Sequence, residues 1–94
     1  MKKIVILPSF ERSIRRFTSI EKDRLVIALE KFNDFLVTGR ISSGLGFKKI
    51  RHDIYEFRID IRLRLIVKDE DDALYMVLAG THEDIKRYLK DFRR

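Results

Sequence analysis

The stretch KKIRHDIYEFRIDIRLRLIVKDEDDALYMVLAGT, residues 48–81, decides the fold. Apolar and polar side chains alternate along most of it, as they do along β-strands that bury one face. The alternation predicts four strands, at residues 47–51, 54–59, 62–68 and 73–79. Only short segments join these strands, which favours an antiparallel meander over parallel strands joined by helices.

On the N-terminal side of this stretch the periodicity becomes helical. Residues 3–7 are a short apolar run that predicts a first strand, and Ser9 is a suitable N-cap for a short helix after it. Thr18 and Glu21 have the spacing of a capping box and predict the start of a second helix, with Gly39 as its C-cap. The apolar residues of this second helix recur every three or four positions: Leu25, Ala28, Leu29, Phe32 and Leu36.

On the C-terminal side the sequence predicts a last helix. Thr81 and Asp84 have capping spacing, and the apolar residues that follow form one stripe: Ile85, Tyr88, Leu89 and Phe92. The predicted order is therefore β-α-α-β-β-β-β-α, which indicates a layered α+β domain. We expect the hairpin of the first two helices to cover one face of the sheet and to leave the other at least partly open.

Length and composition indicate one small, basic domain. The 94 residues predict a single domain over residues 1–94. The net charge of +6 indicates an anionic partner, such as nucleic acid, a ribosomal surface or an acidic protein, although ordinary surface lysines would give the same excess. The absence of cysteine excludes disulfides and zinc–thiolate sites. No apolar run is long enough for a signal peptide or a membrane span, so we expect a cytoplasmic protein.

Alternation also sorts the charged residues of the predicted sheet. In strands 54–59 and 62–68 the apolar side chains point to one face and most charged ones to the other. The second face should gather three arginines and a lysine from the adjoining strand: Arg58, Arg62, Arg64 and Lys48 or Lys49. Guanidinium groups bind phosphate oxygens through paired hydrogen bonds, so such a face suits RNA. The alternative is a solvated strand face that is balanced by Glu56 and Asp60.

His82 is the sharpest candidate for acid–base chemistry. It is one of two histidines in the chain and stands at a strand-to-helix junction, where functional groups are common. Imidazole exchanges protons near neutral pH, but a histidine here could equally act only as a cap or hydrogen-bonding group. Tyr88 fits packing on the apolar stripe better than catalysis, and Glu56 is either a general base or an ion-pair partner of an arginine. No metal-ligand cluster is visible in the sequence, so we expect neither a metal nor a cofactor.

Two segments carry a resemblance to a known family. They are KKIRHDIYEFRIDIRLRLIV, residues 48–67, and LYMVLAGTHEDIKRYL, residues 74–89. With the order of the elements, they resemble the RelE/ParE superfamily of type II toxins over nearly the whole chain. The segment AGTHEDI, residues 79–85, is similar to the GTH-x-D ending of the YafQ branch, whose members cleave mRNA. The resemblance implies a twisted, mainly antiparallel sheet with the helical hairpin on one side and the active surface on the other.

The resemblance also implies functions for single residues. Arg64 matches the arginine that follows the turn in RelE-like ribonucleases, and His82 matches the catalytic histidine of the YafQ branch. Tyr88 falls near the C-terminal tyrosine of RelE, and Arg58 stands where YafQ-like proteins have another histidine. These four residues form the candidate catalytic set. The residues expected to bind RNA are Lys48, Lys49 and Arg62. The sequence departs from the YafQ pattern at Arg58, Arg62 and Lys86.

The activity that the resemblance implies is metal-independent cleavage of mRNA in the ribosomal A site, with the toxin held in check by a cognate antitoxin protein. Two other functions stay open at this point. One is ParE-like inhibition of DNA gyrase without RNA cleavage. The other is an inactive relative that still binds an antitoxin.

Overall fold

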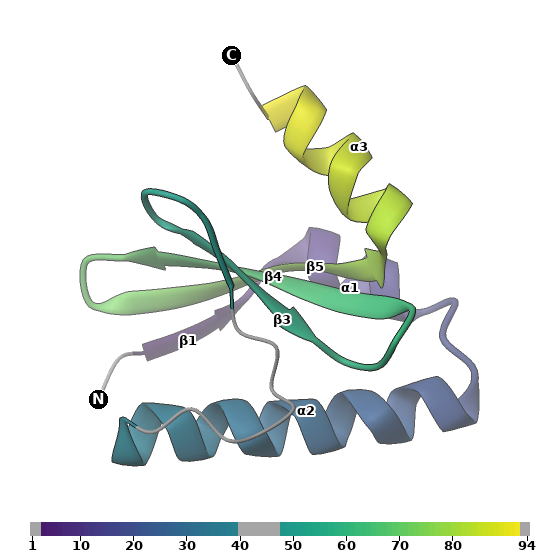
Figure 1. Ribbon diagram of the computed structural model, residues 1–94, viewed down its shortest axis with the longest axis horizontal. Coiled ribbons are helices and arrows are strands. Elements are labelled where there is room, and N and C mark those ends of the chain that lie inside the picture. Colours follow the sequence, from purple (N-terminus) through teal and green to yellow (C-terminus); the bar gives the residue numbers. More distant parts are fainter. Residues whose placement is uncertain (1–2, 40–47, 93–94) are drawn as a thin grey trace.

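The computed structural model describes residues 3–39 and 48–92, which form one five-stranded sheet with helices on both sides (Figure 1). The elements in chain order are β1 (Lys3–Ile6), α1 (Pro8–Ile14), α2 (Ser19–Thr38), β2 (Lys48–Arg51), β3 (Ile54–Arg58), β4 (Leu63–Glu70), β5 (Ala73–Thr81) and α3 (His82–Phe92). This order confirms the predicted α+β class and the β-α-α-β-β-β-β-α sequence of elements.

The strands lie in the order β1-β5-β4-β3-β2. Strands β2 to β5 pair antiparallel, as the short connections predict, whereas β1 pairs parallel to β5 at the far edge. The sheet is therefore mixed but mainly antiparallel. Within the described ranges, no helix is both long enough and apolar enough to cross a membrane.

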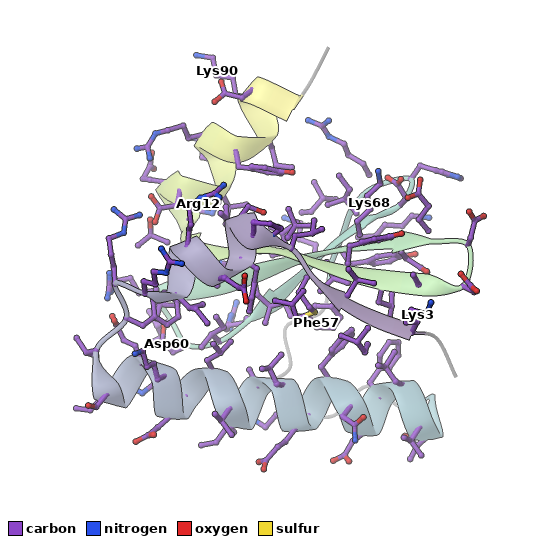
Figure 2. The ribbon with its side chains drawn as sticks, turned by 180° about the vertical axis from the view of Figure 1, so that it is seen from behind. Lys3, Arg12, Phe57, Asp60, Lys68 and Lys90 are labelled. Atoms are coloured by element: carbon purple, nitrogen blue, oxygen red, sulfur yellow. The ribbon has the colours of Figure 1, made fainter. Side chains whose placement is uncertain are left out.

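Helix α2 covers one face of the sheet along its length (Figure 1). Both hydrogen bonds of the predicted capping box between Thr18 and Glu21 are present, and Gly39 ends the helix in the left-handed region at φ 76°. The ring of Phe32 meets the ring of Phe57 edge to face, with centroids 4.4 Å apart. Burial of each such ring contributes roughly 1.5–3 kcal/mol. Figure 2 shows Phe57 between the sheet and α2.

Helix α1 lies against the edge of β5 beyond the point where β1 ends. Strand β1 pairs with residues Ala73 to Met76 of β5. Beyond Met76, serine hydroxyls of α1 form hydrogen bonds with the backbone of β5. The Oγ of Ser9 donates to the carbonyl of Val77, and the Oγ of Ser13 accepts from the amide of Ala79 at 3.0 Å. Backbone groups at a sheet edge need such partners when they are buried. The hydroxyls therefore fix where α1 lies.

Helix α3 packs on the sheet face opposite α2. Ile85 is buried there against Ile54, Ile66 and Val77. A bulge between Ile66 and Val67 lets β5 place Val77 and Leu78 in the same apolar cluster. Helix α3 lies over β4, β5 and Ile54 at the start of β3, so the more open part of this face includes the end of β3 and the start of β4.

The predicted strand ends need small corrections. Strand β4 begins at Leu63 rather than at Arg62, because the Oδ1 of Asp60 accepts hydrogen bonds from the amides of both residues and holds them in a turn. Strand β5 continues past residue 79 to Thr81. Residue 47, the predicted first residue of the second strand, lies outside the described residues.

Candidate functional site

The open part of the α3 face carries a cluster of charged side chains. Arg58 lies directly opposite Arg64 across β3 and β4, and Lys48 lies directly opposite Glu56 across β2 and β3. Residues that are directly opposite in an antiparallel pair point to the same face, as do residues two apart on one strand. These four residues therefore share one face. It is the α3 face, because Ile66, two residues after Arg64, belongs to the cluster beneath α3.

Glu56 is the centre of this cluster. It is 7% exposed, and it is the one buried charged residue in the part of the chain that the structure describes. Its Oε2 lies 3.5 Å from Nη1 of Arg64, whose side chain is only 20% exposed. Burial of a charge costs several kcal/mol unless the charge is paired. The pair with Arg64 therefore offsets the cost of burying Glu56. Arg58 and Lys48 leave the cluster with an excess of positive charge.

The guanidinium of Arg64 is incompletely paired. Its buried Nε has no hydrogen-bond partner among the described residues. A buried N–H without an acceptor costs about 1–3 kcal/mol, and such groups are rare in folded proteins. The guanidinium of Arg64 therefore has hydrogen-bonding capacity that no described residue uses.

The start of α3, at His82, lies at the Arg64 end of this cluster. Gly80 is directly opposite Arg64 in the sheet, and His82, which is exposed, begins α3 two residues later. A β-carbon at Gly80 would lie 2.8 Å from the carboxylate of Asp84, so only glycine lets α3 start this close to the strand. The tight turn from β5 into α3 therefore brings His82 to the Arg64 end of the sheet.

The start of α3 is fixed by a reciprocal pair of hydrogen bonds. The amide of Thr81 donates to Oδ2 of Asp84, and the amide of Asp84 donates to Oγ1 of Thr81. The first of these bonds is the main reason that the pKa of Asp84 lies below its usual value, and Arg87 and Arg16 add to the effect. Asp84 is thus ionised and holds the position of the helix that carries His82.

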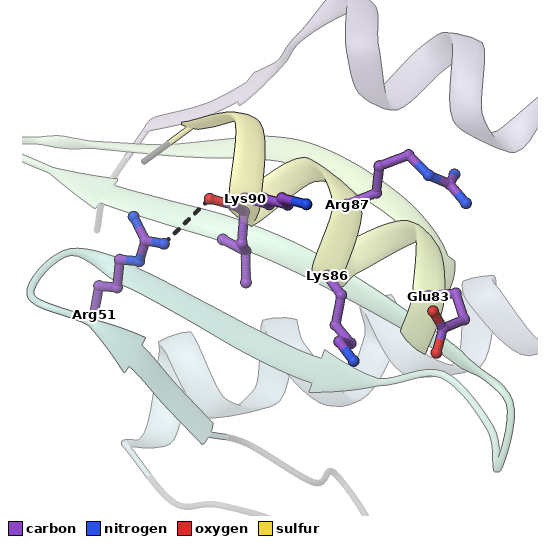
Figure 3. A pocket seen from close by; sticks show the side chains of 6 residues that line it. Arg51, Glu83, Lys86, Arg87 and Lys90 are labelled. Atoms are coloured by element: carbon purple, nitrogen blue, oxygen red, sulfur yellow. Dashed lines mark hydrogen bonds between the residues drawn. The ribbon is translucent and has the colours of Figure 1, made fainter. Parts of the chain in front are cut away.

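A pocket of about 470 Å³ opens between α3 and the end of β2. Arg51 donates through Nη2 to the carbonyl of Leu89 at 3.2 Å, so its guanidinium is held against α3 (Figure 3). The pocket is lined by four cations, one acid and one leucine: Arg51, Lys86, Arg87, Lys90, Glu83 and Leu89. Residues four apart share one side of a helix, so His82, Lys86 and Lys90 follow the same flank of α3. A second group of cations therefore lies along α3, between the helix and Arg51.

None of these further cations was among the site residues predicted from the sequence. The spacing of His82, Lys86 and Lys90 on a predicted helix would have identified two of them. The sequence pattern did not indicate Arg51, because its contact with Leu89 joins residues that are 38 positions apart.

Three predicted site residues lie elsewhere. The expectation that Arg62 joins Arg58 and Arg64 on one face is wrong: Arg62 lies in the turn before β4, and its Nη2 pairs with the carboxylate of Glu21 on α2. Lys49 lies directly opposite Tyr55, whose ring packs on the α2 side of the sheet.

Tyr88 packs against the apolar cluster beneath α3 and is partly buried. At about 100° per residue it lies roughly 120° around the helix from His82. The structure thus brings together Lys48, Arg58, Arg64 and the start of α3 at His82, but not Arg62, Lys49 or Tyr88.

The pKa of Asp60, in the turn beside α2, is also lowered. Burial by itself would raise it, but hydrogen bonds from the backbone of Leu63 and Arg62 and from the side chain of Arg24 outweigh burial. Figure 2 shows Asp60 beside the N-terminal end of α2. This ionised carboxylate ties the β3–β4 turn to α2, away from the basic surface. Among the described residues, no group of three or more His, Asp or Glu side chains is arranged to hold a metal ion.

The sequence matches no protein-family model, and no curated protein matches it. Among solved structures, a chain of the RelB–RelE antitoxin–toxin complex from Methanococcus jannaschii matches with a TM-score of 0.67 at 14% identity, covering 89% of this chain and 96% of that one. A chain of the DinJ–YafQ complex from E. coli matches with a TM-score of 0.65 at 14% identity, covering 90% and 98%. The fold is that of the RelE-like type II toxins.

A metal-bound toxin from Helicobacter pylori has the same fold, with a TM-score of 0.68 at 17% identity over 90% of this chain and 99% of that one. The resemblance read from the sequence is thereby confirmed at the level of the fold, including the order of elements. In this RelE-like domain the charged cluster lies on the sheet face opposite α2, the side on which the resemblance placed the active surface.

Proposed function

We propose that this chain is the toxin of a type II toxin–antitoxin system and that it cleaves mRNA on the ribosome without a metal. The observation that carries the proposal is the cluster of Lys48, Arg58 and Arg64 on one sheet face, with Gly80, two residues before His82, directly opposite Arg64. This arrangement sits on a fold shared with RelE and YafQ.

The chemistry fits an attack within the RNA strand. A base removes the proton from a ribose 2′-hydroxyl, and the oxygen attacks the neighbouring phosphorus. The bond from phosphorus to the 5′ oxygen of the next nucleotide breaks, and an acid protonates that oxygen. The products are a 2′,3′-cyclic phosphate and a free 5′-hydroxyl. His82 acts as the acid or the base, and Arg64 with Arg58 stabilises the charge that builds up on the phosphate oxygens.

The proposal also assigns a function to the remaining cations. Lys48 and the pocket between Arg51 and α3 contact the RNA backbone on either side of the reacting phosphate, because guanidinium and ammonium groups bind phosphates without reading the bases. The site by itself is open and small. The ribosome supplies the positioning of the mRNA that a larger enzyme would provide with its own surface.

The proposed protein partner is a cognate antitoxin with an acidic segment. The solved structures of RelB–RelE and DinJ–YafQ are complexes of a toxin with its antitoxin. An excess of six positive charges on this chain would attract an acidic partner over a long range. The toxin would be made and held inactive in the cytoplasm, where the ribosomes are.

Induction in a bacterial host followed by primer extension tests the proposal. The variants are His82→Ala and Arg64→Ala, and the control is His52→Ala, which removes the other histidine, an exposed one in the turn between β2 and β3. We expect new mRNA ends at codon positions that depend on translation, present with wild type and His52→Ala and absent with both site variants.

Growth arrest with intact mRNA would contradict the nuclease and would indicate a ParE-like target such as DNA gyrase. Absence of both arrest and cleavage would indicate an inactive relative that binds an antitoxin. Normal cleavage by both site variants would leave the activity in place and would show that the site is elsewhere.

A further inference from the structure

Glu56 stands out as a buried acid in the middle of a basic surface. On the sheet it has Lys48 directly opposite on β2 and Ile66 directly opposite on β4. Arg58 follows it on the same face of β3, and Arg64 pairs with it diagonally at 3.5 Å. The groups that face Glu56 from the neighbouring strands are thus one lysine, one arginine and an apolar side chain.

Stability alone does not account for this residue. Replacement of a buried ion pair by apolar side chains is often neutral or stabilising by about 1–4 kcal/mol. The neighbouring Ile66 is fully buried, so an apolar side chain would suit the position of Glu56. A carboxylate here also weakens the attraction of the surface for RNA, since it opposes the three cations around it. Its presence therefore needs a reason other than packing or RNA affinity.

The state of Arg64 supplies that reason. Its guanidinium touches Glu56 through Nη1, while its buried Nε has no acceptor among the described residues. Arg64 also faces Arg58 directly, and two like charges in this position repel each other. Without Glu56, nothing in the described part of the site would hold the Arg64 guanidinium against that repulsion.

We propose that Glu56 is a positioning residue for Arg64: its carboxylate holds the guanidinium in the site before RNA arrives, so that the donors of the guanidinium that Glu56 does not use are already in place for a phosphate oxygen. The inference rests on the ribonuclease function proposed above. A guanidinium that is fixed in advance loses less conformational freedom when it meets the transition state, so its contribution appears in the rate of cleavage rather than in binding.

The first test separates cleavage from binding. The variant is Glu56→Gln, which keeps the shape of the side chain. The control is Glu70→Gln, which breaks the pair of the exposed Glu70 with Lys68 on β4. The single-turnover cleavage rate is measured on ribosomes programmed with mRNA. The dissociation constant is measured on the same complexes with a 2′-deoxy nucleotide at the cleavage position.

We expect Glu56→Gln to lower the cleavage rate by about 10- to 100-fold. Its dissociation constant should stay unchanged or fall, because a negative charge has been removed from the RNA-binding surface. Glu70→Gln should match wild type in both. Cleavage by Glu56→Gln at the wild-type rate would overturn the proposal, and so would a parallel loss of binding and cleavage, which would indicate a general structural effect.

The second test does not depend on cleavage. The Nε–H of Arg64 is followed by nitrogen-15 NMR in the free protein, in wild type, Glu56→Gln and Glu70→Gln, with Arg64→Lys used to assign the signal. We expect faster rotation of the guanidinium in Glu56→Gln than in the other two proteins. An unchanged rotation rate would overturn the positioning of Arg64 by Glu56. If wild type does not cleave mRNA, the proposed function fails, and this measurement still decides what Glu56 does.

Discussion

Arg58 and Arg64 lie directly opposite one another across β3 and β4, so two arginines form a cross-strand pair on the open face of the sheet. Like charges in this position destabilise a sheet by roughly 0.2–1 kcal/mol, less where one of them is exposed, as Arg58 is. A chain that keeps such a pair gives up stability at this position. We take the pair as a sign that both cations serve a ligand.

Replacement of Arg58 should therefore separate stability from activity. We expect Arg58→Gln to leave the free energy of unfolding unchanged or to raise it by up to about 0.5 kcal/mol, since a repulsion is removed. The same variant should cleave mRNA more slowly. Urea unfolding and primer extension measure the two effects, with Arg12→Gln on α1 as the control. Clear destabilisation by Arg58→Gln would show that Arg58 has a structural task instead.

The pocket between β2 and α3 should contribute to RNA binding through charge. We expect Arg51→Gln and Lys86→Gln each to weaken binding of a single-stranded RNA. Each should also reduce the slope of log K against log salt by about 0.7 for every phosphate that the variant no longer neutralises. Fluorescence anisotropy over a range of salt concentrations measures both. Lys22→Gln, at an exposed position near the start of α2, is the matched control. Equal slopes for all three variants would place the RNA elsewhere.

The capping pair at the start of α3 should make stability depend on pH. Asp84→Ala removes the acceptor of the Thr81 amide, and we expect it to cost about 1 kcal/mol of unfolding free energy at neutral pH. The folded-state pKa of Asp84 is lowered, so its contribution is complete above the unfolded value near 4 and is lost as the pH falls through the lower folded value. Thermal unfolding of wild type and variant from pH 7 to pH 2 should show the difference shrinking in acid. A difference that persists at pH 2 would contradict this account.

The hydroxyl of Ser13 should be needed at the edge of β5. It accepts from the amide of Ala79 and donates to the carbonyl of Phe10, and Ser13→Ala leaves the amide without that partner. We expect a loss of about 1–3 kcal/mol and faster hydrogen exchange of the Ala79 amide. Ser19→Ala, at the exposed start of α2, is the comparison. Wild-type stability of Ser13→Ala would mean that water or a shifted backbone replaces the hydroxyl.

Much of the site follows from local pattern. The period of two in β3 and β4 places Glu56, Arg58 and Arg64 on the face opposite the apolar set, and the structure has them there. The prediction was wrong for Arg62 because alternation places side chains only inside a strand. Hydrogen bonds to the side chain of Asp60 keep Arg62 in the turn, so β4 begins one residue later than the pattern indicated.

Sequence by itself therefore determined the class of fold, the order of elements, the caps at Thr18 and Thr81, and the faces of the strands. These features depend on residues within a few positions of one another. Tertiary structure alone decided that β1 lies parallel to β5, that Arg62 turns to Glu21 on α2 and that Arg51 reaches α3. Those contacts join parts of the chain that are far apart in sequence, where no local periodicity constrains the pairing and only packing of the whole domain selects it.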